Sequence, residues 1–309
     1  MDGAEQHQHL PGRPSPAPSV LLTGATGFVG SFLAASLRAA CSVRTAGRSV
    51  PAGGYAHVTV AAFGRESDWR RALDGIDAVV HCAGPAHAKH GEAELRRAIV
   101  DASAALAAQA ARAGVRRFVY VSSIRACVSV THGAAVSEEE PARPDDAYGR
   151  AKLEAEKAIL AEATIQPIAL RPPLVIGPGA KGNLGALLRA LDTPLPLPFA
   201  GIDNKRNVIS LPSLAEAVRL ALEPANPATG VFHAADQPAL STPQMAALLR
   251  EGMGRPRRLF AAPAFKALAP RPLVQSLEVD DSRLRATFGY RGQDAREALV
   301  ACGRAWARR

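Results

Sequence analysis

Short apolar runs alternate with longer helix-forming stretches over the first 171 residues of the chain. The apolar runs that we expect to form strands cover residues 19–23, 42–47, 58–62, 78–82, 118–122 and 168–171. They are apolar throughout rather than at alternate positions, which predicts strands buried on both faces, as in a parallel sheet. The helix-forming stretches between them are residues 28–39, 92–113 and 148–163. This alternation predicts βαβ units and an α/β fold with a doubly wound parallel sheet.

The pattern changes after Arg171. Six prolines interrupt residues 172–198, and two or three more helices are expected beyond them. We therefore expect three parts: a flexible, Pro-rich tail at residues 1–18, the main α/β domain at residues 19–171, and a smaller C-terminal lobe at residues 172–309. Some segments of that lobe are free to rejoin the main sheet.

Composition narrows the class of protein. Hydrophobic residues make up 48% of the 309, which is enough for a large core. No apolar run reaches the roughly 18 to 20 residues of a membrane-spanning helix, and the first residues lack the apolar segment of a secretory signal. We expect a cytoplasmic protein that binds no membrane. The net charge is +9, but the arginines are scattered and no recognition motif accompanies them, so nucleic acid is not an expected partner.

The first predicted strand runs into a glycine-rich loop, Thr23-Gly-Ala-Thr-Gly-Phe-Val-Gly30, directly before a helix. Glycines at these positions allow a tight turn and a close approach of the backbone to a pyrophosphate. The free N–H groups at the start of the helix bind phosphate oxygens. Because the strand and the helix flank the loop, the pattern predicts a Rossmann-type, NAD(P)-binding domain over residues 19–171.

Cofactor choice depends on the end of the second strand. A carboxylate there would hold the ribose hydroxyls of NAD, but the sequence has Gly47-Arg48-Ser49 instead. The Arg48 guanidinium suits the 2′-phosphate of NADP. The alternative is that Arg48 is an ordinary surface arginine. We therefore expect NADP or NAD, with NADP slightly favoured.

A tyrosine and a lysine, Tyr148 and Lys152, stand four residues apart on one face of a predicted helix. An ammonium group near a phenol lowers the phenol's pKa and suits it to proton transfer with an alcohol or ketone. Ser122 and Ser123 end an apolar strand upstream, and a serine there can hydrogen-bond the reacting oxygen. The tyrosine, the lysine and one of these serines form the predicted catalytic group.

Taken together, these motifs resemble the extended short-chain dehydrogenase/reductase superfamily, and within it the NAD-dependent epimerase/dehydratase family. The resemblance spans residues 19–290 and rests on the segments TGATGFVG at 23–30, DAVVHCAG at 77–84, RRFVYVSS at 116–123, YGRAK at 148–152 and RPPLVIGPG at 171–179. Residues 181–207 are most similar to bacterial UDP-sugar 4-epimerases and UDP-4-keto-sugar 4-reductases of surface-polysaccharide pathways.

The resemblance implies a role for each matching residue. Tyr148 would be the acid/base, Ser123 would position the oxygen, and Lys152 would also hold the nicotinamide ribose. Asn183 and Arg206 would contact the nucleotide diphosphate, which makes the C-terminal lobe mainly substrate-binding. The residues expected to contact the cofactor are Gly24, Thr26, Gly27, Phe28, Val29, Gly30, Arg48, Ala83, Tyr148 and Lys152. The family also implies a homodimer.

Several positions depart from the family pattern. The acidic residue usual after the third strand is absent, with Ala61-Ala62-Phe63 in its place, and Ile99 stands where the long central helix usually has asparagine. The usual aromatic-Val-Asp-Asp/Asn segment is replaced by residues 209–213. These changes suggest a divergent member with altered specificity.

Other functions stay open at this point. One alternative is a non-catalytic NADP(H)-binding regulator that senses redox state, and another is a reductase of non-nucleotide carbonyl compounds. Retention of all three predicted catalytic residues weighs against the first. His81, His87 and His90 lack the carboxylate neighbours of a metal site, so we expect no metal. The acidic loop 138–146 is expected to be solvated, and the cysteines are expected to be reduced.

Overall fold

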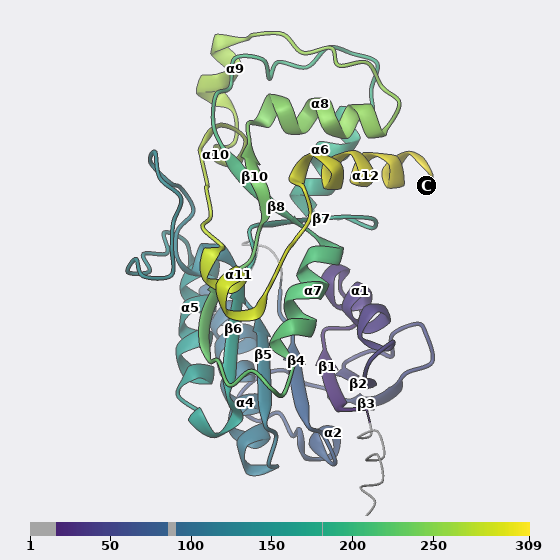
Figure 1. Cartoon of the computed structure of the whole chain (residues 1–309), viewed down its shortest axis with the longest axis vertical. Coiled ribbons are helices and arrows are strands. Elements are labelled where there is room, and N and C mark those ends of the chain that lie inside the picture. Colours follow the sequence, from purple (N-terminus) through teal and green to yellow (C-terminus); the bar gives the residue numbers. More distant parts are fainter. Residues whose placement is uncertain (1–16, 86–90, 181) are drawn as a thin grey trace, which may run out of the picture.

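The computed structural model describes residues 17–85, 91–180 and 182–309. Residues 1–16 of the tail predicted at residues 1–18 lie outside the described residues. Seven parallel strands form the main sheet in the order β3-β2-β1-β4-β5-β6-β9 (Figure 1). Their bounds are β1 Ser19–Thr23, β2 Ser42–Gly47, β3 Ala56–Thr59, β4 Ala78–His81, β5 Arg117–Val121, β6 Pro167–Arg171 and β9 Gly230–His233. The strand order runs outward in both directions from β1, which confirms the predicted doubly wound sheet.

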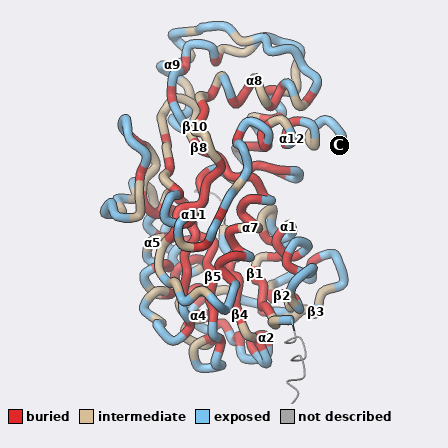
Figure 2. Tube along the Cα trace, in the orientation of Figure 1, coloured by how far each residue is buried: buried red, intermediate tan, exposed pale blue. Residues whose placement is uncertain are grey.

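Helices cover both faces of this sheet. One face packs against α1 Phe28–Leu37, α7 Leu211–Ala221 and α11 Ser282–Phe288. The other packs against α2 Arg70–Leu73, α4 Ala102–Arg112 and α5 Ala147–Leu160. Every residue of β4, β5 and β6 is buried, as their continuous apolar runs predict. Figure 2 shows this buried core along the centre of the sheet.

The helix predicted over residues 92–113 is not α-helical throughout. It consists of α3 Glu92–Leu95, a π-helical turn at Arg96–Asp101 and α4. Ile99 and Val100 in the π-helical turn are buried against the sheet. Such turns insert an extra residue into a helix and often occur beside functional sites.

A second, three-stranded sheet organises the C-terminal lobe. Its order is β10-β8-β7, formed by β10 Asp236–Leu240, β8 Arg206–Ser210 and β7 Leu174–Ile176. The lobe's helices are α6 Gly182–Leu191, α8 Thr242–Gly252, α9 Pro263–Leu268, α10 Arg271–Val274 and α12 Ala295–Ala307. Part of the chain after residue 171 belongs to the main sheet and its helical layer, namely α7, β9 and α11. The two sheets therefore share one continuous body (Figure 1).

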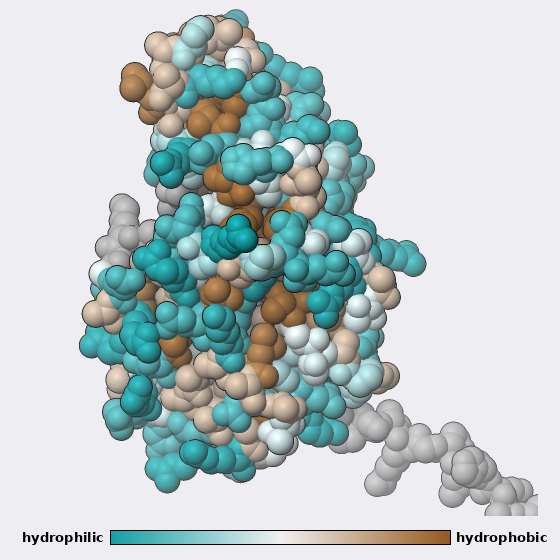
Figure 3. Space-filling model, turned by 90° about the vertical axis from the view of Figure 1, so that its left-hand side faces the viewer, coloured by the Kyte–Doolittle hydropathy of each residue, from teal (hydrophilic) through white to brown (hydrophobic). Residues whose placement is uncertain are grey.

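The surface is mainly polar. On the face shown in Figure 3, hydrophobic residues gather only in small separate patches. In the described part of the chain, no helix has the length and hydropathy needed to cross a membrane. All four cysteines are free thiols.

Candidate active site

The glycine-rich loop joins β1 to α1 at the carboxyl edge of the main sheet. Gly24 has a φ of +77°, and a Cβ there would lie 2.8 Å from the backbone nitrogen of Ala83, so this position requires glycine. A Cβ on Gly30 would lie 2.1 Å from the carbonyl oxygen of Gly24. The backbone N–H of Ala83 donates to Thr23 Oγ1 at 3.3 Å, which ties the loop to the end of β4. The glycine backbone, which carries no side chains, and the amino end of α1 together form a cradle that suits a pyrophosphate.

The other predicted loop contacts lie in the same turn. Gly27 precedes α1, and its N–H donates to the Gly24 carbonyl at 2.9 Å. Thr26 is exposed, while Phe28 and Val29 are half-buried. Phe28 also packs against the hydrophobic cluster of the C-terminal lobe, so the loop touches both parts of the molecule.

The cation predicted to select the cofactor is at the surface. Arg48 follows the last residue of β2 and is exposed, and Ser49 beside it is exposed as well. Within the described residues, no carboxylate forms an ion pair with Arg48. This guanidinium is therefore available to an anionic group beside the end of β2.

The three predicted catalytic side chains come together at the carboxyl end of β5. Ser123 follows β5, and Tyr148 and Lys152 occupy the first two turns of α5. Tyr148 is 8% exposed and Lys152 is 5% exposed. The Ser123 hydroxyl is close enough to the Tyr148 phenol to lower its pKa slightly against the effect of burial. The Lys152 ammonium donates to the Val121 carbonyl at 3.0 Å and lies 5.9 Å from the centre of the Tyr148 ring.

Burial dominates the acid–base properties of this group. It raises the pKa of Tyr148 to about 12, against the opposing charge of Arg125, and lowers the pKa of Lys152 to about 8. The sequence argument predicted that Lys152 would lower the phenol's pKa. In the structure the nearest aromatic ring to the ammonium is instead that of Tyr120, at 4.6 Å, and the cation that lowers the pKa of Tyr148 is Arg125.

A buried polar chain links the glycine loop to this group. Thr23 Oγ1 lies 2.6 Å from His81 Nδ1, and His81 Nε2 lies 2.9 Å from the Ser103 hydroxyl. The His81 ring stacks on Tyr120 with the two centres 5.5 Å apart. Burial lowers the pKa of His81 to about 3, so the imidazole is neutral. His81 is thus a packing residue. His87 and His90 lie outside the described residues, among which no cluster of metal ligands occurs.

The predicted substrate contacts lie in the C-terminal lobe. Arg206 begins β8, and its Nη1 donates to the Gln275 carbonyl at 2.8 Å. Burial lowers its pKa to about 10. No carboxylate of the described chain forms an ion pair with Arg206, so this desolvated cation suits an anionic ligand. Asn183 lies in the first turn of α6, and its side chain is outside the described part.

Sequence reasoning missed a buried ion pair behind the catalytic group. Glu156, which is 1% exposed, pairs with Arg171 at 2.7 Å and accepts a hydrogen bond from the Ser122 hydroxyl. The signal was the spacing itself: Tyr148, Lys152 and Glu156 follow one another at four-residue intervals and share one face of α5.

The loop before α5 makes more contacts with the rest of the chain than its acidic composition predicts. Val136 pairs with residues 278–280 of the C-terminal lobe through two backbone hydrogen bonds of 2.9 and 3.0 Å. Glu138 accepts the His233 N–H at 2.6 Å, and Asp146 caps the amino end of α5. The expectation that this loop is solvated is therefore wrong for Glu138 and Asp146, because both carboxylates bind backbone N–H groups.

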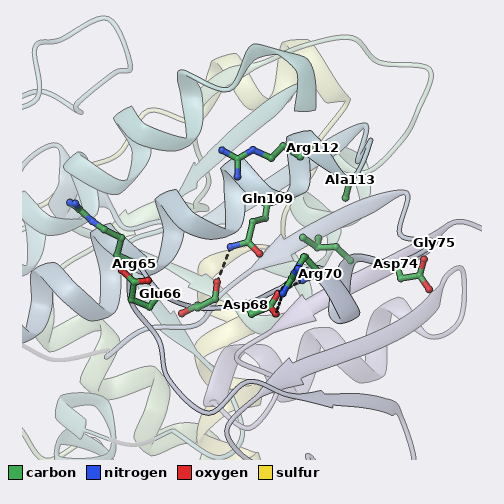
Figure 4. A pocket seen from close by; sticks show the side chains of 11 residues that line it. Arg65, Glu66, Asp68, Arg70, Asp74, Gly75, Gln109, Arg112 and Ala113 are labelled. Carbon is green, nitrogen blue, oxygen red and sulfur yellow. Dashed lines mark hydrogen bonds and ion pairs between the residues drawn. The ribbon is translucent and has the colours of Figure 1, made fainter.

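A well-defined cavity lies elsewhere, away from these side chains. It has a volume of about 690 Å³ and lies beside α2 and the last turn of α4, where Arg65, Glu66, Asp68, Arg70, Gln109 and Arg112 line it (Figure 4). Asp74 and Gly75 in its wall precede β4, so the cavity opens at the amino ends of the strands. Ligands of doubly wound sheets bind at the carboxyl ends, where the glycine loop and Ser123 lie.

Known proteins resemble this chain over most of its length. A sequence profile described as the NAD dependent epimerase/dehydratase family matches residues 20–234. A UDP-glucose 4-epimerase of Vibrio cholerae is 32% identical over 88% of this chain and 90% of its own length. A dTDP-6-deoxy-L-talose 4-dehydrogenase (NAD(P)(+)) of Kitasatospora kifunensis is 28% identical over 87% and 90%. The solved structure of MoeE5 in complex with UDP-glucose and NAD has a TM-score of 0.74 and 25% identity, covering 94% of this chain and 98% of that one.

Proposed function

The chain belongs to the NAD-dependent epimerase/dehydratase family, and on that premise we propose that it is a 4-epimerase of a UDP-sugar. The observation that carries the proposal is the convergence of Ser123, Tyr148 and Lys152 beside the glycine cradle, with the desolvated Arg206 in the adjoining lobe. A UDP-4-keto-sugar 4-reductase is the second candidate, favoured by the similarity to a dTDP-sugar 4-dehydrogenase. Both reactions would use the same side chains.

Tyr148 would accept the proton of the sugar's 4-hydroxyl while the hydrogen on C4 leaves as hydride. When bound, NAD(P) supplies the acceptor and donor of that hydride. Ser123 would hydrogen-bond the same sugar oxygen and hold it against the phenol. For epimerisation, Tyr148 would return the proton after the hydride comes back to the opposite face of C4. A 4-reductase would carry out only the return steps, in which hydride is added to C4 of the keto-sugar and Tyr148 gives its proton to the sugar oxygen.

Lys152 and Arg206 would prepare the site for these steps. Lys152, whose ammonium lies 5.9 Å from the centre of the Tyr148 ring, would hold the nicotinamide ribose, while the charge of Arg125 favours the phenolate that forms on proton release. Arg206 would bind the diphosphate of the nucleotide sugar with a charge-assisted contact. We also propose a preference for NADP, supported by the exposed Arg48 and the lack of a carboxylate at the end of β2.

A substrate panel tests the proposal. The protein is incubated with UDP-sugars and UDP-4-keto-sugars, with NADH or NADPH, while the absorbance of the reduced cofactor and the products are followed together. A 4-epimerase converts a UDP-sugar with no net change in reduced cofactor, whereas a 4-reductase oxidises one cofactor per keto-sugar. Cofactor binding without turnover of any panel member would contradict both and favour a regulator. Turnover of simple ketones or aldehydes alone would favour a non-nucleotide reductase.

A further inference from the structure

An ion pair joins the segment that carries Ser123 to the helix that carries Tyr148. Arg125 lies in the short 3₁₀ turn Ile124–Ala126 directly after Ser123. Its Nε and Nη2 both donate to Asp146 Oδ2, at 3.0 and 2.5 Å. The other oxygen of Asp146 accepts the Gly149 N–H at 2.8 Å and so caps α5. One carboxylate therefore binds both segments.

The backbones of the same two segments are in direct contact. A Cβ on Gly149 would lie 2.2 Å from the Arg125 carbonyl oxygen, so the first turn of α5 rests on the 3₁₀ turn. The Ser123 hydroxyl accepts the Arg125 N–H at 3.3 Å, which orients the serine. The Arg125 guanidinium lies over the Tyr148 ring, with its carbon 5.0 Å from the ring centre.

We propose that Arg125 and Asp146 form a positioning pair that holds the Ser123 hydroxyl against the Tyr148 phenol and sets the charge around it. The inference rests on the proposed acid/base role of Tyr148. Neither residue contacts the reacting atoms; both act through Ser123 and Tyr148. The two hydrogen bonds to Asp146 Oδ2, the cap and the guanidinium over the ring all serve the same two side chains, whereas an ordinary surface ion pair touches only its own members.

The charges around Tyr148 make the pair testable. Arg125 lowers the pKa of the phenol and Asp146 raises it. Lys152 lies beside the ring on the same helix, and Tyr120 faces the ring from β5. The charged residues of α3 and of the π-helical turn pair instead with exposed residues of α5, in the ion pairs Glu92–Arg150 and Arg96–Glu154. Removing Arg125 should therefore raise the pKa of the phenol, and removing Asp146 should lower it. Loss of packing alone would not shift the pKa in two opposite directions.

The experiment places 3,5-difluorotyrosine at position 148, because its phenol ionises at a lower pH than tyrosine, and follows the titration by ¹⁹F NMR. Arg125→Gln is expected to raise the apparent pKa and Asp146→Asn to lower it, each by about half to one pH unit. Arg125→Lys keeps the charge and is expected to stay close to the unsubstituted protein. Asparagine is a good helix cap, so Asp146→Asn keeps the fold if Arg125→Gln does not. Shifts of both variants in the same direction, or no shift in either, would overturn the proposal.

Turnover provides the second measurement. In the unmodified enzyme, Arg125→Gln is expected to lower kcat about tenfold with KM nearly unchanged, and Arg125→Lys to recover part of the loss. The matched control is Arg70→Gln, which breaks the surface pair of Arg70 with Asp68 and should change neither measurement. The ¹⁹F titration needs no substrate. If the panel finds no turnover, the proposed function fails while the titration still decides whether the pair acts on residue 148.

Discussion

Two arginines that we assign to phosphate groups lie in opposite environments. Arg206 is largely desolvated and donates to the Gln275 carbonyl, whereas Arg48 is exposed. A desolvated cation gains most from an anionic ligand, and an exposed one gains less because water and salt screen it. The two residues should therefore respond differently to substitution and to salt.

Arg206→Ala should raise the KM for a UDP-sugar by about 10- to 150-fold, because it removes a charge-assisted contact of about 1.5 to 3 kcal/mol. Steady-state kinetics give the KM, and a fluorescence titration of the dinucleotide gives the control, which should hardly change. Arg206→Lys keeps a charge without the planar fork and should be intermediate. An unchanged KM, or loss of dinucleotide affinity instead, would remove Arg206 from the substrate site.

Arg48 should make NADPH bind more tightly than NADH. If the guanidinium contacts the 2′-phosphate, the affinity ratio is about 10 to 150. The ratio should shrink as salt is raised, and Arg48→Ala should weaken NADPH binding while leaving NADH nearly untouched. Fluorescence titration of both cofactors at two salt concentrations measures this. Equal affinities in the unsubstituted protein would leave Arg48 as an ordinary surface arginine.

Single residues could be predicted from the sequence where the pattern is local. Tyr148 and Lys152 are four apart in one helix, and Ser123 comes shortly after a strand. Arg125 and Asp146 are 21 residues apart, and Glu156 and Arg171 are 15 apart. A charged residue looks the same in a sequence whether it is solvated or paired inside the fold, so these two pairs required the tertiary structure.

At the scale of elements, hydrophobic periodicity placed the buried strands well and the edge strand less well. The third strand was predicted at residues 58–62 and lies at Ala56–Thr59. It pairs on one side only, with β2, and none of its residues is buried, so its apolar signal is weak. The π-helical turn was missed because one inserted residue barely changes the helical pattern on either side.

The packing of α8 against α12 depends on two glycines. A Cβ on Gly303 would lie 2.1 Å from the Leu249 carbonyl oxygen, and one on Gly252 would lie 2.1 Å from the Val300 carbonyl oxygen. Gly303→Ala should therefore lower the free energy of unfolding by about 1 to 3 kcal/mol, because the helices must move apart. Chemical denaturation measures the change. Gly91→Ala, where no atom lies within 4 Å of the added Cβ, is the control. Equal stability of the two variants would contradict this account of the contact.

At the scale of the whole molecule, the doubly wound sheet followed from the alternation of apolar runs, but the path of the chain beyond Arg171 did not. β9 has four residues and pairs with β6, although β7, β8 and two helices lie between them in the sequence. Such a return depends on contacts between distant segments, which no local pattern records.

Burial of Lys152 should cost the molecule stability. Its pKa is about 8 in the folded chain and near 10.5 when unfolded, so the unfolded state binds more protons between these values and stability rises with pH across that window. The cost is fully present below pH 8 and vanishes above about 10.5. Lys152→Met should therefore raise the free energy of unfolding at pH 7 by about 1 to 3 kcal/mol, with the gain disappearing near pH 10 to 11. Denaturation at several pH values tests this, and a destabilised variant at pH 7 would contradict it.

The central claim is that Tyr148 transfers the proton in a reaction on a nucleotide sugar. The most direct measurement is the kcat of Tyr148→Phe on the UDP-sugar that the unsubstituted enzyme converts, with cofactor binding measured in parallel. Phenylalanine keeps the ring and removes the ionisable oxygen, so the account predicts a loss of about 10²- to 10⁴-fold with cofactor affinity preserved. Turnover within a factor of about three of the unsubstituted enzyme would contradict it, because a general acid/base cannot be lost at so little cost.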